Sequence, residues 1–417
     1  MPVTKAEIAV IGGGIIGVTS ALELQRAGRS VVLVEPREIG VGTAGGSAGY
    51  LSDSHIFPIA TANTVLRIPQ MLLDPLGPLV IRPAYAPHMI GWGLRFLSSL
   101  RPSRARAATS ALASLNRDAL RRLFELASTA GAGEYLSREG ALSVCLEAGN
   151  LREQAAHIPV YRSYGINVGE VTGREISDLE PALARDFIGG LFFPDEARCL
   201  DPGAFGRRLA ASFIETGGVT VPEAATEIES KSDGSWNVHF ANKDVISAES
   251  VVVSAGVWSR PLLERLGYRV PLETERGYHL MLPKPELTVQ RPVHFVERRF
   301  VATQMLEGLR LAGTAEFAGL DAPMDPRRSD VLYQLARPYL PGLSNAGATR
   351  WMGYRPNLPD SLPAIGKSTK HRNLYYNFGH QHLGLTQSAA SAHILSSVVV
   401  GSDLDIDIAP FSLDRFT

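Results

Sequence analysis

A glycine cluster between two short apolar runs constrains the fold of this chain more than any other feature. Ile8-Ala9-Val10-Ile11 precedes Gly12-x-Gly14-x-x-Gly17, and a helix-like segment then runs from Ile15 to Ala27. Val31-Val32-Leu33-Val34 follows and closes at Glu35-Pro36. Short, fully apolar strands are typical of the buried centre of a parallel sheet, and a helix between two of them makes a βαβ unit. We therefore expect this unit to open an α/β domain.

The spacing of these glycines predicts a dinucleotide site in a Rossmann-like domain. Gly12 permits a tight turn, Gly14 lets a pyrophosphate approach the main chain, and Gly17 lets helix and strand pack closely. The helix start at Ile15 and Ile16 offers unpaired N–H groups and partial positive charge to phosphates. Glu35, with Pro36 beside it, is placed to accept hydrogen bonds from both ribose hydroxyls of an adenosine. A glycine-rich turn without a ligand is the alternative.

Three further stretches favour FAD over NAD. A loop of small residues follows the Glu35 strand, Ser254-Ala255-Gly256 ends a distant apolar strand, and Gly379 to Gly384 opens a helix rich in small residues. That helix start can direct N–H groups at the flavin edge that gains negative charge on reduction; an ordinary tightly packed helix is the alternative. The expected contacts are Thr43, Ala44, Gly45, Gly46, Ser47, Ala48, Gly49, Ala255, Gly256, Trp258, Gly353, Gly379, His380, Gln381, His382, Leu383, Gly384, Leu385 and Thr386.

Composition narrows the class of protein. The 417 residues suffice for two or three domains and an enclosed site. A net charge of −1 argues against a nucleic-acid partner held through counterion release. Cys145 and Cys199 lack the spacing of a metal site and favour a reducing compartment. Since no signal-peptide pattern or membrane-spanning apolar run occurs, we expect a cytoplasmic protein without a bound metal.

The remaining patterns divide the chain into two interleaved parts. Helical periodicity dominates from 62 to 135, while strand-like pieces recur between 219 and 253 and between 269 and 353. A final strand and helix, Leu374 to Val399, are expected to return to the N-terminal unit. We therefore expect a discontinuous FAD-binding domain from residues 1–60, 195–268 and 350–417. An α+β substrate-binding domain with a mixed sheet is expected from residues 61–194 and 269–349.

With the stretches above, the run Gly353-Tyr354-Arg355-Pro356-x-x-Pro359-Asp360-x-x-Pro363-x-x-Gly366 resembles the FAD-dependent D-amino-acid oxidase/dehydrogenase superfamily. Arg276-Gly277-Tyr278-His279 makes the chain most similar to its bacterial D-amino-acid dehydrogenases. The resemblance implies oxidative deamination of a D-amino acid, or a cyclic relative such as D-proline or hydroxyproline, by hydride transfer to flavin, giving an imino and then a keto acid. The alternatives are an oxidase or dehydrogenase of sarcosine, glycine or opine type, and a flavin-bearing electron-relay subunit of a hetero-oligomer.

The same resemblance implies the substrate site. Arg355 corresponds to an arginine that clamps the substrate carboxylate, and Tyr278 to a tyrosine that helps to hold it. His279 is expected to point away from the pocket, because neighbours on a strand face opposite sides. His380, His55 and Tyr50 are further expected pocket residues, and purely structural roles are the alternative for each of these side chains.

The binding partners and the mode of FAD attachment are inferred from the same resemblance. Neither cysteine falls in the motifs, so non-covalent FAD is expected, with attachment through a histidine as the alternative. The expected partners are a small amino-acid substrate and a quinone or other electron acceptor. Arginines between 95 and 122 accompany Trp92 and Phe96, which predicts either a solvated helix face or peripheral contact with the inner membrane surface. The oligomeric state has no signature in the sequence.

Overall fold

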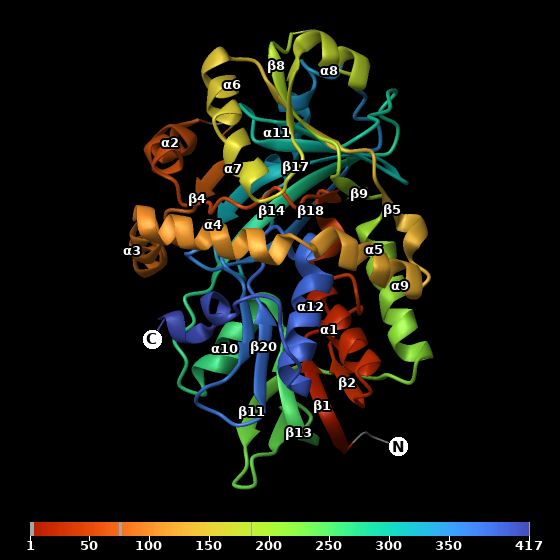
Figure 1. The fold of residues 1–417 in the computed structure, drawn as a ribbon, viewed down its shortest axis with the longest axis vertical. Coiled ribbons are helices and arrows are strands. Elements are labelled where there is room, and N and C mark those ends of the chain that lie inside the picture. Colours follow the sequence, from red (N-terminus) through yellow and green to blue (C-terminus); the bar gives the residue numbers. More distant parts are fainter. Residues whose placement is uncertain (1–3, 75–76, 185, 417) are drawn as a thin grey trace.

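The computed structural model describes residues 4–74, 77–184 and 186–416 (Figure 1). Two lobes lie along the long axis of the molecule, and each is built around one large sheet. Strand β1 and the C-terminal segment lie in the same lobe, which is the lower one in Figure 1. Helices α4 and α5 run across the junction between the lobes.

The lower lobe contains an eight-stranded sheet with a parallel centre. Its strands are, in spatial order, β10 (Val219–Val221), β2 (Val31–Val34), β1 (Lys5–Ile11), β13 (Val245–Val253), β12 (Trp236–Phe240) and β11 (Ala225–Ser230), with β20 (Leu374–Phe378) paired to β13 and β19 (Ala364–Lys367) to β20. Strands β10, β2, β1, β13 and β20 run parallel. Val251 pairs with Ala9 on one side and Leu374 on the other, so the C-terminal strand returns to the N-terminal unit as expected.

Alternation along β1 builds a core on each face of this sheet. Ile8 and Val10 pack among the helices, whereas Ala9 and Ile11 join the core on the opposite face. The helices on the first face are α1 (Ile15–Arg26), α4 (Pro102–Asn116), α5 (Ala119–Thr129), α9 (Pro202–Glu215) and α12 (Gly384–Val400), and α10 (Ser259–Glu264) lies on the other. Small residues let α12 approach α1 closely enough for the Thr19 hydroxyl to donate to the Ser388 carbonyl at 3.2 Å.

The upper lobe contains a nine-stranded mixed sheet, which confirms the expected fold class. Its strands are β18 (Thr349–Asn357), β14 (Glu273–Leu282), β17 (Gly308–Phe317), β16 (Phe300–Met305), β15 (Val293–Phe295), β6 (Ala141–Cys145), β8 (Gly189–Phe193) and β7 (Gly169–Thr172), with β4 (Leu79–Ile81) paired to β17. The β15–β6 and β17–β4 pairs are parallel, and the other pairs are antiparallel. Helices α8 (Gly173–Leu179) and α11 (Arg327–Ala336) contribute to its core.

Short elements join the lobes and complete the fold. A three-stranded sheet combines β3 (Tyr50–Leu51), β9 (Ala197–Cys199) and β5 (Leu136–Ser137). The remaining helices are α2 (Ala62–Leu73), α3 (Met89–Ser98), α6 (Ala148–Ala155), α7 (Ile158–Ser163), and the 3-10 turns η1 (Thr43–Gly46), η2 (Ala86–His88), η3 (Gly133–Tyr135), η4 (Gly256–Trp258), η5 (Ala409–Phe411) and η6 (Leu413–Phe416). No helix in the described ranges is long and apolar enough to cross a bilayer.

Candidate active site

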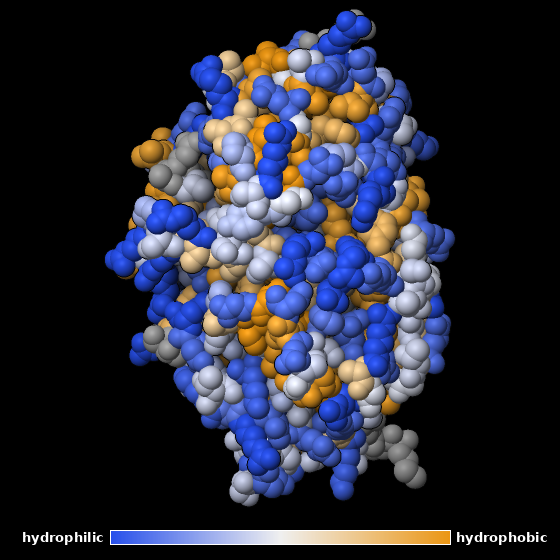
Figure 2. Space-filling view, in the orientation of Figure 1, coloured by the Kyte–Doolittle hydropathy of each residue, from blue (hydrophilic) through white to orange (hydrophobic). Residues whose placement is uncertain are grey.

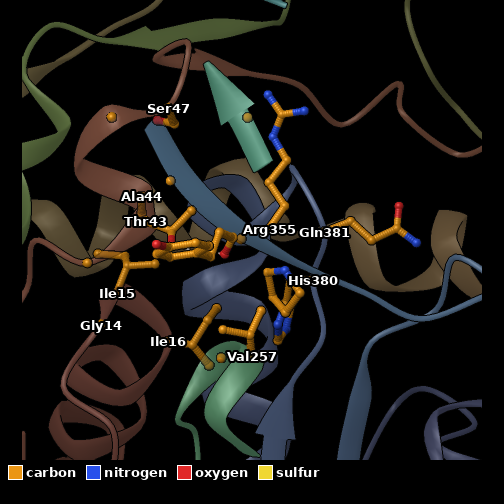
Figure 3. Close-up of a pocket in the computed structure, with 18 of the residues that line it drawn as sticks. Gly14, Ile15, Ile16, Thr43, Ala44, Ser47, Val257, Arg355, His380 and Gln381 are labelled. Atoms are coloured by element: carbon orange, nitrogen blue, oxygen red, sulfur yellow. Dashed lines mark hydrogen bonds between the residues drawn. The ribbon is translucent and has the colours of Figure 1, made fainter. Parts of the chain in front are cut away.

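A cavity of about 890 Å³ is lined by residues of both large sheets, of η1 and η4, and of the starts of α1 and α12 (Figure 3). Most residues expected at the cofactor line it: Gly12, Gly14, Ile15, Ile16, Glu35, Pro36, Thr43, Ala44, Gly46, Ser47, Ala48, Ala255, Gly256, Trp258, Gly353, Gly379, His380, Gln381, His382, Leu383, Gly384 and Leu385. The expected substrate residues Tyr50, His55, Tyr278 and Arg355 line it as well. Tertiary structure thus gathers segments from across the chain around one space.

At one end of the cavity, the glycine turn leaves the start of α1 uncapped. Gly12 has φ +103°, a conformation that favours glycine. The N-cap of α1 is Gly14, whose lack of a side chain leaves the first N–H groups of the helix facing the cavity. Glu35 Oε2 accepts the Gly13 N–H at 2.9 Å, and Oε1 accepts the Arg37 N–H at 3.1 Å. A carboxylate has further lone pairs, so Glu35 can still accept from ribose hydroxyls.

Four expected contacts lie behind the cavity wall instead of lining it. A Cβ on Gly17 would lie 1.7 Å from the Gly12 carbonyl oxygen, so this glycine serves the packing of helix against turn. Gly45 packs against Val41, and Gly49, at φ +65°, packs against the Cys199 carbonyl. Thr386 is buried in the first turn of α12, where its hydroxyl accepts the Ser52 N–H at 3.4 Å.

The small-residue loop is anchored to the upper lobe. Arg310 donates to the Ser47 carbonyl at 2.7 Å, and His279 Nδ1 donates to the Gly46 carbonyl at 2.8 Å. The His279 ring also stacks on Trp351 at 5.1 Å, and a Cβ on Gly46 would clash with that indole at 2.3 Å. Tyr278 is among the cavity-lining residues and His279 is not. These contacts hold the small-residue loop in place along the cavity.

His380, just before α12, has no partner for its ring. The side chain is 3% exposed, and neither ring nitrogen makes a hydrogen bond within the described part of the chain. Burial lowers the pKa of His380 to about 3, so the ring is neutral. Buried polar atoms are rarely left unpaired. The unpaired ring nitrogens of His380 are therefore suited to hydrogen-bond a polar group of a molecule bound in the cavity. The uncapped start of α1 fits the phosphates of FAD, and the uncapped start of α12 fits the flavin edge. The Glu35 carboxylate fits the ribose.

Arg355 is positioned by the strand opposite it. Its Nη1 pairs with Glu275 of β14, which also accepts the Asn357 amide at 2.5 Å. Among the described residues, Nε and Nη2 have no hydrogen-bond partner, and the side chain is 22% exposed. Figure 3 shows Arg355 and His380 extending in opposite directions, with Gln381 turned away from both. The fixed guanidinium therefore has donors free for an anion.

The Tyr278 hydroxyl, in contrast, already has a protein partner. It donates to Glu316 Oε2 at 2.5 Å, and Glu316 also pairs with the buried Arg276 and with Arg82. Burial raises the pKa of Tyr278 to about 12. The tyrosine therefore borders the cavity while its hydroxyl belongs to a buried ion-pair network.

Three histidines meet at the end of the cavity near Arg355. The rings of His55 and His382 lie 5.5 Å apart, and Tyr50 packs edge-on against His55 at 5.6 Å. Burial lowers the pKa of His55 and His294 to about 4 and that of His382 to about 3. All three side chains are therefore neutral near pH 7 and offer hydrogen bonds without adding positive charge.

Sequence reasoning missed several residues of the cavity. Tyr354 follows the recognised Gly353 and Trp351 lies two residues before it, but His294 and Arg299 lie in a hairpin without any motif. Other unpredicted lining residues are Val257, Pro261, Leu262, Arg265 and residues 224–226. Neither Cys145 nor Cys199 lines the cavity, and the described residues contain no cluster suited to a metal. Non-covalent attachment of FAD stays a prediction.

Comparisons with known proteins give the chain its family. The family model described as FAD dependent oxidoreductase matches residues 7–398. A D-amino-acid oxidase of Bradyrhizobium diazoefficiens is 34% identical over 98% of both chains, and a D-amino acid dehydrogenase of Paramagnetospirillum magneticum is 31% identical over 99% of both. Among solved structures, glycine oxidase from Geobacillus kaustophilus has a TM-score of 0.75 at 22% identity and 99% coverage of both chains. L-proline dehydrogenase from P. horikoshii has a TM-score of 0.76 at 18% identity, covering 100% of this chain and 98% of its own. The chain belongs to the FAD dependent oxidoreductase family.

Proposed function

We propose that this protein oxidises the carbon–nitrogen bond of a D-amino acid, or of a cyclic relative such as D-proline or hydroxyproline. The product is an imino acid, which water converts to a keto acid; an acyclic imino acid releases its nitrogen as ammonium. The observation that carries the proposal is Arg355, whose guanidinium is held by Glu275 in the same cavity as the dinucleotide turn. The names of the relatives at 34% and 31% identity support the same substrate class.

The residues around the cavity have different roles in the proposed reaction. Arg355 binds the substrate carboxylate through its unpaired N–H groups, because a guanidinium stays charged when water is excluded. FAD, when bound, would supply the acceptor for the two electrons that leave the substrate. Neutral His380, just before α12, contacts FAD or the substrate. Tyr278 shapes the pocket with its ring. Correct placement of the substrate supplies most of the rate in this arrangement.

The expected domain division is proposed with two adjustments. Residues 1–60, 195–268 and 350–417 form the cofactor half, and residues 61–194 and 269–349 form the substrate half. Helices α4 and α5, however, pack in the core of the eight-stranded sheet and so belong with the cofactor half. Strand β18 pairs with β14 in the nine-stranded sheet, so residues 349–357 extend from the cofactor half into the substrate half. Arg355 thereby reaches the substrate from the junction of the two.

Oxidation of sarcosine, glycine or an opine is the competing enzymatic function, and the fold shared with glycine oxidase favours it. A flavin-bearing relay subunit is the competing non-catalytic function. Anaerobic mixing of the yellow protein with D-, L-, N-methyl and cyclic amino acids separates these functions, since bleaching by D-amino acids alone supports the proposal. Bleaching by none of them contradicts it. Oxygen uptake by the reduced protein then distinguishes an oxidase from a dehydrogenase with a quinone or other acceptor.

We also propose a cytoplasmic protein whose α2–α3 face touches the inner membrane. Leu66 and Leu73 of α2 are 79% and 84% exposed, and Ile90 and Leu94 of α3 are each 64% exposed. Figure 2 shows orange atoms at the left edge, where Figure 1 places α2. Exposed leucines beside arginines favour an anionic lipid surface. Sedimentation with anionic vesicles, reduced in a Leu66→Ser/Leu73→Ser variant, tests this contact.

A further inference from the structure

A buried carboxyl lies behind the wall of the cavity that carries the histidines. Glu196 is 1% exposed, yet it pairs with no arginine or lysine in the described part of the chain. Its partners are three hydroxyl groups: Tyr50 donates to Oε2, and Ser52 and Ser54 donate to Oε1. A carboxylate without a cation is costly to bury. Its position beside a cavity therefore indicates a functional role.

The direction of these hydrogen bonds fixes the tautomer of His55. When Glu196 is ionised, the single Ser52 hydroxyl proton is donated to it at 2.5 Å, so Ser52 accepts from His55 Nδ1 at 2.6 Å. Ser54 lies 3.0 Å from Ser52, but its own proton also goes to Glu196. His55 therefore carries its proton on Nδ1 and keeps a lone pair on Nε2. His55 also lines the cavity, so the chain links Glu196 to the substrate space.

We propose that His55 accepts a proton from the substrate ammonium group, and that the Ser52 hydroxyl passes a proton from His55 on to the Glu196 carboxylate. This inference rests on the proposed function. One N–H bond of the ammonium breaks as the Nε2–H bond of His55 forms. In the same step the Nδ1 proton passes to Ser52 and the Ser52 hydroxyl proton passes to Glu196 Oε1, so the buried His55 ring does not become charged. No electrons are transferred in this step. The substrate becomes a neutral amine, whose lone pair assists loss of the neighbouring carbon-bound hydrogen.

The groups around the relay set its pH range. Burial raises the pKa of Glu196 to about 7, with the Asp53 carboxylate adding to the rise and the three hydroxyls opposing it. Tyr161 also lies near Glu196, while His294 and His382 surround His55. Since only ionised Glu196 can receive the proton, flavin reduction should quicken as pH rises through about 7.

The test compares His55→Gln and Ser52→Ala with Ser54→Ala in the FAD-loaded enzyme, by anaerobic flavin bleaching with a D-amino acid across pH. Ser54 is the matched control, since it donates to the same oxygen of Glu196 but does not touch His55. His55→Gln and Ser52→Ala should slow reduction at pH 7 by about 100-fold, the scale of general base catalysis. Ser54→Ala should stay within about threefold of the wild type above pH 8, because the relay is intact. The losses should shrink above the pKa of the substrate ammonium, where free amine needs no proton acceptor.

A purely structural role would give a loss that is independent of pH, and this result would overturn the proposal. Unchanged rates in His55→Gln would overturn it too. Ser52→Thr, which keeps a hydroxyl, should restore reduction, whereas a Ser52→Thr variant as slow as Ser52→Ala would count against the relay. Retention of yellow FAD shows that each variant folds. If the wild type itself is not bleached by any amino acid, the proposed function fails, whereas normal wild-type bleaching with unaffected variants removes only the relay.

Discussion

Gly277 of β14 leaves the space that the guanidinium of Arg355 fills on the neighbouring strand β18. A Cβ on Gly277 would lie 2.5 Å from Cζ and Nε of Arg355. Gly277 itself pairs with Gly353, while Arg355 pairs with Glu275, so the arginine side chain leans diagonally across the glycine. Glycine at this position therefore decides where the positive charge of Arg355 lies in the cavity.

Gly277→Ala should displace that guanidinium and weaken substrate binding. Because the added methyl group meets the rigid end of a paired side chain, we expect KM to rise about tenfold or more, which corresponds to about 1.4 kcal/mol. Steady-state kinetics at saturating FAD measure the change. Gly169→Ala is the matched control, since a Cβ on this strand glycine meets nothing within 4 Å. Equal effects of the two substitutions would contradict the role of Gly277.

Arg355→Ala should raise KM steeply while FAD stays bound. Removing one partner of a buried charge pair costs about 2–5 kcal/mol, so we expect KM to rise about 100-fold or more. Titration of flavin bleaching with substrate, and the absorbance of the yellow protein, report the two properties separately. Arg355→Lys should recover only part of the loss, because an ammonium cannot pair with Glu275 and a carboxylate in the same planar geometry. Unchanged kinetics in Arg355→Ala would exclude the carboxylate role.

Glu35→Ala should weaken FAD binding and spare the substrate site. The carboxylate holds the Gly13 N–H in the turn and is available to the ribose, and hydrogen bonds to charged groups contribute about 1.5–3 kcal/mol. We therefore expect the Kd for FAD to rise at least about tenfold, measured by quenching of flavin fluorescence on titration. At saturating FAD, KM for the amino acid should stay close to that of the wild type. A large change in KM with unaltered FAD affinity would contradict this assignment.

Buried histidines should make the fold sensitive to acid. Burial lowers the pKa of His279 and His380 to about 3, whereas an unfolded histidine titrates near 6.5. Their contribution to stability is fully present above pH 6.5 and is lost as pH falls toward 3, because the unfolded chain takes up the protons. Each should add about 1.4 kcal/mol per pH unit to the slope in that range. Urea unfolding between pH 7 and 5 should give a shallower slope in His279→Gln/His380→Gln, while His88→Gln at an exposed position should leave it unaltered.

Much of the candidate cofactor site was predictable from sequence because the patterns that indicate it are local. The turn after β1, the uncapped start of α1 and Glu35 lie within one βαβ unit, whose spacing follows from strand and helix geometry. The glycines before α12 were recognisable for the same reason. Sequence assigned Gly17 to packing, but it did not separate the glycines that face the cavity from Gly45 and Gly49, which serve packing behind it. Both kinds of glycine stand where a side chain would not fit, and only the atoms around each position show whether it faces the cavity or the protein interior.

The sequence by itself determined the dinucleotide turn, the apolar strands around it and the presence of Arg355 in a distinctive run. Tertiary structure alone decided that Glu275 would face Arg355, that Glu316 would take the Tyr278 hydroxyl, and that Glu196 would meet Ser52 from 144 positions away. Strand periodicity states which face a side chain occupies, but it does not state which strand lies alongside or in which register. These pairings depend on how distant strands align, and each buried carboxyl finds its partner only after that alignment is set.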